Sequence, residues 1–483
     1  MNAKFFDVIV LGENLAGLIA ASLLASRKYS VLLIRKFAGP GRDTVVGQAV
    51  RRRWTMFPGI FDHPAPTAVI RELNLGHKFR SVFKSSSPLF QIVGPRNRTT
   101  IHEDRSKLVA ELRREFSDLT TGEEIQTFFA RLDEFNSLMD HFLVPGLNFH
   151  PDGIKERWTQ SGKVKEFEKS VEAADALVGD LGRFWRDSPL GWNMDLINHV
   201  AADAGQGYDL RFAYRRAYDL FREMLYQVAG EGIDEILLEF MDRRSVRVLD
   251  QTAITEIATG RGGYQFFDAK NSYGGESIVC AFDYFLLPEL WRDRKIEKFL
   301  QKQLGRVRPG RVWIKQSYIL ERDVIPEGMG HTVFLLPESG RDDLLVLHRD
   351  PLTPEDAEVE RLDVNQLIPI GRFNEDGLKE IQEQTIDRIR DFIPFLDGKL
   401  RKIYLEQTVK PDSAMTHLAG RRLSYDASDD ALFRGVPYCL PLDHVYLAGP
   451  EVAPELGLEG EFLTGWAIAR QVCARKPKKD DLR

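Results

Sequence analysis

The stretch that decides the fold is residues 6–36, FDVIVLGENLAGLIAASLLASRKYSVLLIRK. An apolar run ends at Gly12, a short turn follows, and an apolar segment over residues 15–25 precedes a second apolar run over residues 29–34. This order predicts a strand, a tight turn, a helix and a second strand, which together make a βαβ unit. Such a turn presents backbone N–H groups and the positive end of a helix dipole to an anion, so we expect a dinucleotide pyrophosphate there.

The turn departs from the dinucleotide fingerprint at two places. Gly12 and Gly17 occupy the first and third glycine positions, but Asn14 occupies the second, where the pyrophosphate approaches the backbone. Arg35, followed by Lys36, stands where an acidic residue usually binds a ribose hydroxyl. A cation there can instead accommodate a ribose phosphate, as in NADP sites, or reach another phosphate. The remaining possibility is a Rossmann-type unit whose site no longer binds a ligand.

Composition excludes several classes of protein. The chain has 483 residues, of which 43% are hydrophobic and 29% charged, as in an ordinary globular protein of two or three domains. A net charge of −6 argues against a general nucleic-acid binder. Cys280, Cys439 and Cys473 show no metal-ligand spacing and fit free thiols in a reducing compartment. No secretory signal and no apolar run of ~20 residues is present, so we expect a cytoplasmic protein without a transmembrane segment.

The middle of the chain changes from helical to strand-like patterns. Thr121 and Glu124 form a predicted capping box, and apolar residues recur at helical spacing from there to Pro145. Further helices are predicted at about 164–184, 210–228 and 378–392, and short strands with glycine turns between 245 and 347. Aromatic residues are frequent in the helical part. They are expected to form core, or alternatively a wall over an apolar substrate tunnel.

The last block of the sequence is the most specific. A short apolar strand ends at Gly449, PEVAPELGLEG follows, and an apolar helix is predicted over about 462–472. Together with residues 12–42 and 230–287, in this order and spacing, the chain resembles the FAD-dependent amine-oxidase and phytoene-desaturase superfamily. The resemblance implies an α/β fold, in which a Rossmann-like FAD-binding domain is interleaved with an α+β substrate domain that contains an antiparallel sheet and a helical insert.

The resemblance also implies which positions hold the cofactor. Glu451 matches an acid near the ribityl-pyrophosphate part of FAD, and the backbone at Ile254 matches the strand position that meets adenine. The turn before the last helix would lie beside the pyrimidine edge of the flavin. The full set of implied cofactor-binding residues is Gly12, Asn14, Leu15, Ala16, Gly17, Arg35, Lys36, Arg42, Ile254, Gly449, Glu451, Gly457, Leu458 and Gly460.

The implied domains alternate along the chain. Segments 1–75, 229–295 and 421–475 are expected to build the dinucleotide-binding domain. Segment 76–228 is expected to be a mostly helical substrate or lid region, and segment 296–420 a substrate domain with an antiparallel sheet.

The function implied is an FAD-dependent oxidoreductase (an oxidase, dehydrogenase or desaturase) that takes a hydride from an apolar or amine-bearing small molecule. No catalytic residue is assigned, and the histidines, His63 among them, are expected to be ordinary hydrogen-bonded residues. Two alternatives stay open: a flavin-free scaffold of the same fold that binds a protein or lipid partner, and an NADP-linked oxidoreductase. Peripheral membrane contact is compatible with the sequence, no metal is expected, and the oligomeric state is not predicted.

Overall fold

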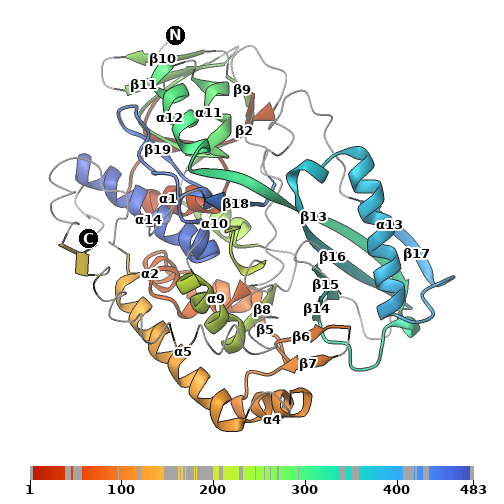
Figure 1. Cartoon of the computed structure of the whole chain (residues 1–483). Coiled ribbons are helices and arrows are strands. Elements are labelled where there is room, and N and C mark those ends of the chain that lie inside the picture. Colours follow the sequence, from red (N-terminus) through yellow and green to blue (C-terminus); the bar gives the residue numbers. More distant parts are fainter. Residues whose placement is uncertain are drawn as a thin grey trace.

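The computed structural model places two large sheets side by side, with helices packed around the first and beneath both (Figure 1). It describes residues 4–38, 45–46, 57–95, 97–116, 121–145, 200–205, 210–227, 232–244, 246–254, 256–260, 263–268, 271–291, 293–337, 344–349, 358–405, 418, 421–427 and 435–478, with isolated residues between 162 and 181.

The first sheet contains the predicted βαβ unit. Its parallel strands follow the order β19 (Val445–Leu447), β12 (Ser272–Ala281), β1 (Lys4–Gly12), β2 (Val31–Ala38) and β9 (Arg247–Ala253). The hairpin of β10 (Glu256–Gly260) and β11 (Gly263–Phe267) pairs with β12, and β3 (Val45–Val46) pairs antiparallel with β2. Strands β1 and β2 come from one end of the chain and β19 from the other, so the sheet joins distant segments.

The first sheet is buried on both faces, which explains the unbroken apolar run of β1. Residues 8–11 have no exposed surface, as is typical of a parallel strand covered by helices. Helix α1 (Leu15–Ser26) packs between α14 (Gly457–Arg475) and α10 (Ile233–Asp242). The contact of α1 with α14 is so close that a Cβ atom added to Gly465 would lie 2.7 Å from the Ala16 carbonyl oxygen.

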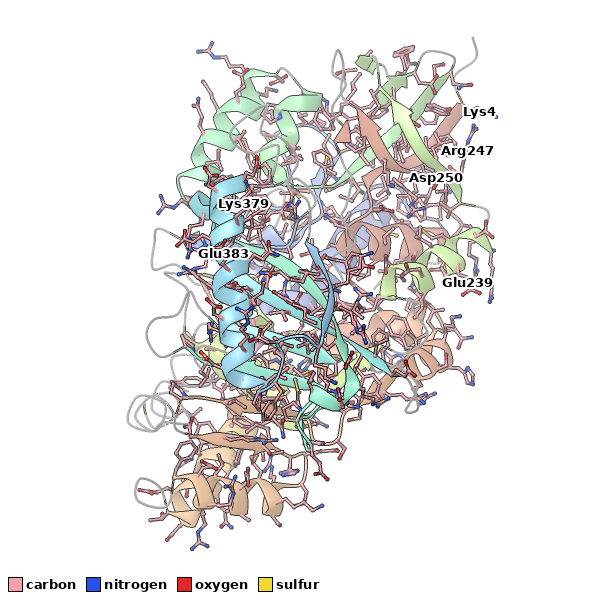
Figure 2. The ribbon with its side chains drawn as sticks, turned by 90° about the vertical axis from the view of Figure 1, so that its right-hand side faces the viewer. Lys4, Glu239, Arg247, Asp250, Lys379 and Glu383 are labelled. Atoms are coloured by element: carbon pink, nitrogen blue, oxygen red, sulfur yellow. The ribbon has the colours of Figure 1, made fainter. Side chains whose placement is uncertain are left out.

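The second sheet is largely antiparallel, as the strand pattern predicts. Its order is β17 (Leu400–Leu405), β13 (Val307–Glu321), β16 (Val359–Pro369), β15 (Leu345–Arg349), β14 (Thr332–Leu335), β6 (Phe90–Val93) and β7 (Arg98–Ile101), with β18 (Leu423–Ala427) paired to β13. Helix α13 (Glu375–Phe392) covers this sheet. Ile381 and Ile389 of α13 are buried, while Lys379 and Glu383 lie on its outer face (Figure 2).

Helices and short strands from the middle of the sequence fill the rest. They are α2 (Pro64–Glu72), α3 (Gly76–Val82), α4 (Arg105–Glu115), α5 (Gly122–Phe142), α9 (Leu210–Arg222), α11 (Leu287–Leu290) and α12 (Arg294–Leu304), with β4 (Phe57–Pro58), β8 (Met224–Gln227) and β5 (Phe83–Ser85) in a small sheet. The domain boundaries stay a prediction; β6 and β7 come from segment 76–228 but join the second sheet.

Local sequence signals placed some of these helices correctly. The capping box at α5 is present: the Glu124 carboxylate accepts from the Thr121 backbone N–H at 2.7 Å, and the Thr121 hydroxyl accepts from the Glu124 N–H at 3.2 Å. The helix predicted over 210–228 ends at Arg222, because the chain turns there into β8 and pairs with β5. The helix predicted over 164–184 falls largely outside the described residues.

Two expectations from the sequence concern membrane-spanning helices and the cysteines. No helix among them is both long and apolar enough to span a bilayer. The three cysteines are free, and complete burial raises the pKa of the Cys280 thiol well above its usual value, so this thiol is protonated at neutral pH.

A candidate dinucleotide site and a buried ionic cluster

The carboxyl ends of β1 and β12 meet at Gly12, which explains the glycine. Its φ is +94°, and a Cβ atom there would lie 2.2 Å from the Ala281 carbonyl oxygen. A Cβ atom added to Gly17 would lie 2.3 Å from the Ala281 side chain. Both glycines therefore allow α1 and its turn to approach β12 closely, as the first and third glycines of a dinucleotide-binding unit do.

Asn14, at the second glycine position, caps α1 instead of leaving the helix end open. Its Oδ1 accepts from the Gly17 N–H at 3.0 Å, and its Nδ2 donates to the Ala448 carbonyl just beyond β19. Its own backbone N–H donates to Ala281 at 3.3 Å. The side chain is nearly buried, so Asn14 links the ends of β1, β12 and β19. Asparagine is among the best N-cap residues, and this accounts for its place here.

A second side chain reaches the same helix end from the opposite terminus of the chain. The Ala16 N–H donates to Glu461 Oε2 at 3.4 Å, and Glu461 is completely buried in α14. Sequence analysis did not single out Glu461. The signal was a charged residue between Gly460 and Phe462 in an apolar segment, but no local pattern shows that it faces α1.

The Arg35 side chain pairs with two carboxylates, one of them in the turn after β1, and this does not support a phosphate-binding role. Its Nε donates to Glu13 at 2.5 Å, and its Nη1 donates to Asp250 of β9 at 2.9 Å. Burial opposes the charged guanidinium, but the carboxylates of Glu13 and Asp250 outweigh burial and raise the pKa of Arg35. Figure 2 shows Asp250 and Arg247 on β9, at this edge of the first sheet.

The remaining predicted residues are spread over three segments. Lys36 is half-buried on β2, Ile254 is buried directly after β9, and Arg42 lies outside the described residues. Gly449 follows β19, and Glu451 after it has no exposed surface.

The structure changes the expected start of the last helix. The helix α14 begins at Gly457 and not near residue 462, so Gly460 and Leu458 belong to its first turn. Gly457 has a φ of +52°, and a Cβ atom on it would lie 2.7 Å from the Ala201 carbonyl oxygen. A Cβ atom on Gly460 would lie 2.5 Å from the Ala453 carbonyl oxygen. Both glycines therefore permit close packing at the start of α14. Because they interrupt the apolar pattern there, the sequence predicted a start for this helix that is too late.

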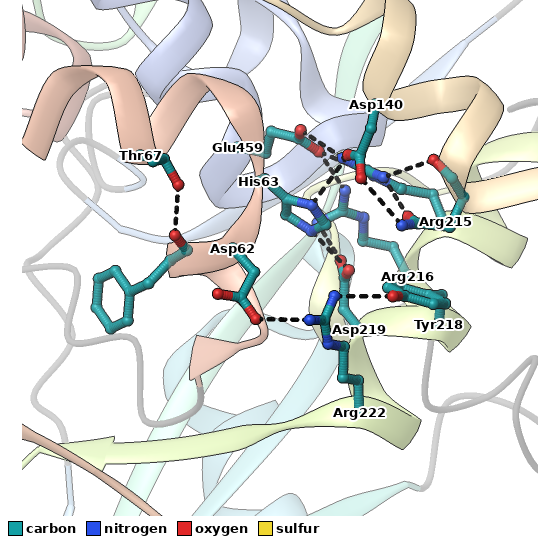
Figure 3. Close-up of polar contacts among 12 residues, drawn as sticks. Asp62, His63, Thr67, Asp140, Arg215, Arg216, Tyr218, Asp219, Arg222 and Glu459 are labelled. Atoms are coloured by element: carbon teal, nitrogen blue, oxygen red, sulfur yellow. Dashed lines mark hydrogen bonds and ion pairs between the residues drawn. The ribbon is translucent and has the colours of Figure 1, made fainter. Parts of the chain in front are cut away.

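A buried ionic cluster lies at the same end of α14. We use this name for His63, Asp140, Arg215, Arg216, Asp219 and Glu459 (Figure 3). Glu459, in the first turn of α14, accepts from Nη2 of Arg215 and from Nη2 of Arg216, each at 2.8 Å. The side chain of His63, at the start of α2, lies with Nε2 2.6 Å from Asp219 Oδ1. The cluster therefore ties α2, α5, α9 and α14 together.

Charges in the cluster compensate one another. Burial disfavours the imidazolium of His63, but the carboxylates of Asp219 and Glu459 outweigh burial and raise its pKa to about 9. Burial likewise favours the neutral form of Glu459, but Arg215 and the other nearby cations hold its pKa well below its usual value. His63 is thus protonated at neutral pH and belongs to an ion-pair network, which sequence analysis missed.

The aromatic residues of α5 and α9 pack against each other. The rings of Phe129 and Phe221 have centroids 5.1 Å apart at 88°, and Phe135 and Tyr214 meet edge to face at 6.0 Å. All four are buried, which supports the core interpretation for these residues. A cavity of about 520 Å³ lies beside Thr121, Phe128 and Leu181, none of them a predicted site residue. No group of His, Cys, Asp and Glu among the described residues is arranged to hold a metal.

Solved structures of flavin amine oxidases share this architecture over their full length. A single-residue mutant of putrescine oxidase matches with a TM-score of 0.58 at 12% identity, covering 98% of this chain and 100% of that one. The chain has the amine-oxidase fold. Cyclohexylamine oxidase from Brevibacterium oxydans matches with a TM-score of 0.54 at 13% identity, covering 98% and 100%. An oxidoreductase from Methanosarcina mazei matches at 0.56 and 11%, covering 95% and 99%.

These likenesses confirm the predicted resemblance and the predicted fold class. No protein-family model and no curated protein matches the sequence. At these identities the likeness shows the fold.

The glycine turn and the converging strand ends fit FAD. The N-terminus of α1, where the pyrophosphate would bind, fits only in part. Gly12 and Gly17 provide the tight turn, and the ends of β1, β12 and β19 converge as a dinucleotide site requires. The Ala16 and Gly17 amides, however, already donate to Glu461 and Asn14. A pyrophosphate at these amides would have to displace both side chains.

Proposed function

We propose that this chain is an FAD-dependent oxidoreductase that takes a hydride from an apolar or amine-bearing small molecule. The observation that carries the proposal is the convergence of β1, β12, β19 and the first turns of α1 and α14, in a chain with the amine-oxidase fold from end to end. Putrescine oxidase and cyclohexylamine oxidase, by their names, act on amines, and this supports the amine-bearing class.

The residues proposed to hold FAD are those of the α1 turn and of the segment after β19. The first-turn amides of α1 would bind the pyrophosphate, Glu451 would lie beside the ribityl chain, and the first turn of α14, with Leu458, would face the flavin. When bound, FAD would accept the hydride, whereas the protein supplies position and electrostatics. The buried ionic cluster would fix the first turn of α14 and exclude water from its packing against α9.

The absorption spectrum of the purified protein tests this proposal. We expect flavin bands in the isolated protein, or a saturable shift of these bands when the protein is titrated with FAD at equilibrium, and bleaching of the bands by a substrate amine without oxygen. The control is the same titration of protein unfolded in denaturant, which should cause no shift. Absence of flavin bands in the isolated protein together with no shift on titration would contradict the proposal.

One observation favours a second candidate, a flavin-free scaffold of the same fold. Asn14 and Glu461 satisfy two of the first-turn amides that would hold the pyrophosphate, so these two amides have partners without a cofactor. For the NADP-linked alternative, the pairing of Arg35 with Glu13 and Asp250 gives no support, because the guanidinium is already neutralised by two carboxylates. The same spectrum separates the scaffold from the oxidoreductase.

A further inference from the structure

Two of the backbone donors in the first turn of α1 are bonded to side chains of this chain. The Gly17 N–H donates to Asn14 Oδ1 at 3.0 Å and the Ala16 N–H to Glu461 Oε2 at 3.4 Å. The ends of helices attract anions through free N–H groups and the helix dipole. A carboxylate is an anion of the kind that such an end accepts, so Glu461 satisfies the requirement that a phosphate would satisfy.

Glu461 is delivered to this position by tight helix packing. The close approach of α14 to α1 at Gly465 brings the second turn of α14 beside the start of α1. Glu461 has no exposed surface and Asn14 is almost fully buried. Moving a carboxylate out of such a place requires breaking its contacts, and leaving it beside a pyrophosphate brings like charges together in a region of low dielectric.

Asn14 adds a second obstacle at the same place. Its Nδ2 donates to the Ala448 carbonyl beyond β19, so the side chain bridges the gap between the two segments that a pyrophosphate would enter. Nearby, Arg35 is held by Glu13 and Asp250 and offers no unpaired cation to offset the charge of a phosphate.

The geometry points to a dinucleotide site that the protein closes with its own residues: Glu461 and Asn14 act as an internal substitute for the pyrophosphate and limit the affinity for FAD. This inference rests on the proposed function, since it concerns the same site. It predicts that FAD binds weakly and reversibly to the natural chain. It also predicts that removal of the internal carboxylate tightens binding.

The test compares FAD and ADP binding by the natural chain and by three variants. Glu461→Gln keeps the size of the side chain and removes its charge, Glu461→Ala also removes its volume, and Asn14→Gly frees the Gly17 amide. Glu276→Gln on β12 is the matched control, because it makes the same charge change in a residue that pairs with Lys476. Binding is measured by quenching of flavin fluorescence for FAD and by calorimetry for ADP, and thermal unfolding identifies any variant that does not fold.

We expect the Glu461 variants to bind both ligands about tenfold more tightly than the natural chain, Asn14→Gly to gain less, and Glu276→Gln to change nothing. Unchanged or weaker binding of both ligands in folded Glu461→Gln and Asn14→Gly would overturn the inference. If the natural chain binds FAD tightly and the variants gain nothing, the inference fails and the proposed function stands. If the variants gain affinity for ADP but none of the proteins takes up FAD, the inference stands and the proposed function fails.

Discussion

Arg215 and Glu459, which are 244 residues apart in the sequence, form an ion pair with no exposed surface on either side chain. Arg215 also lies 2.7 Å from Asp140 through Nη2, and Arg216 pairs with Glu459 from the next position of α9. Charges buried in this way are tolerated only when they are paired and hydrogen-bonded. The pair therefore determines how the first turn of α14 sits against the helical part of the molecule.

Removal of the Glu459 charge should destabilise the protein strongly. Glu459→Gln leaves Arg215 and Arg216 without a full counter-charge in a buried place, and we expect a loss of about 3–5 kcal/mol in the free energy of unfolding. Urea unfolding measures this loss. The control is Glu239→Gln on α10, where the side chain is exposed and labelled in Figure 2, and where we expect almost no change in stability. Equal stability of the two variants would contradict the role of the cluster.

Because His63 is protonated in the fold, the stability of the protein should fall as the pH becomes alkaline. Its pKa is raised from 6.5 in the unfolded chain to about 9 in the fold, so the stabilisation is fully present below pH 6.5 and is lost as the pH rises through 9. The expected loss is about 3 kcal/mol over this window. Urea unfolding at pH values across the window measures it. His63→Gln, which carries no charge, should be less stable at neutral pH and lack most of this slope. A variant with the slope of the natural chain would refute the assignment.

Asp7 anchors the C-terminal residues to the first strand. The ammonium groups of Lys476 and Lys478 each lie 2.8 Å from its carboxylate, and the Ser30 N–H donates to it at 2.7 Å. Burial opposes ionisation, but these contacts outweigh burial and lower the pKa of Asp7. The stabilisation is therefore present above pH 3.8, the ordinary pKa of the group, and is lost as the pH falls toward the lower folded value.

Asp7→Asn measures the strength of this anchor. We expect a loss of about 1–2 kcal/mol at neutral pH, with part of the ion-pair contribution screened by solvent because Lys476 is 42% exposed. The variant should also lose less stability on acidification than the natural chain. Asp387→Asn, on the exposed face of α13, makes the same chemical change where we expect almost no effect. A matching effect of both substitutions would show that Asp7 has no special role.

A carboxylate placed at the first position of α1 should weaken FAD binding without weakening the helix. Leu15 is half-buried at this position. A carboxylate in the first turn interacts favourably with the positive end of the helix dipole but repels a pyrophosphate. We expect Leu15→Glu to bind FAD about tenfold more weakly than Leu15→Gln, which loses the same apolar contacts. Flavin fluorescence measures binding and thermal unfolding measures stability. Equal affinities in the two variants would place the pyrophosphate elsewhere.

The parts of the fold that depend on local pattern could be predicted. The order of apolar runs placed β1, α1 and β2, and the Thr121 capping box placed the start of α5. Spacing alone could not predict that α9 gives way to β8, because β8 is stabilised by pairing with β5, a segment about 140 residues earlier in the chain.

The glycine turn of the candidate site could be predicted from the sequence, but the contacts of its polar residues could not. The pattern suggests Asn14 as a residue beside a ligand, yet it caps α1; it suggests Arg35 as a phosphate contact, yet Arg35 pairs with Glu13. Glu461 and Arg215 form hydrogen bonds with partners that are hundreds of residues away in the sequence. A single sequence carries no signal for such pairs, because their geometry arises only when the two sheets and the helices pack together.

The order of strands in the first sheet has a consequence for how the protein folds. The strand β1 is synthesised before its parallel neighbour β12, which comes some 270 residues later, and β19 and α14 come later still. During synthesis the nascent β1 and β2 therefore expose apolar faces and an unpaired edge until these later segments have been made. Closing loops of this length costs entropy before any pairing is gained, so we expect slow acquisition of the native state and a need for chaperones at high expression.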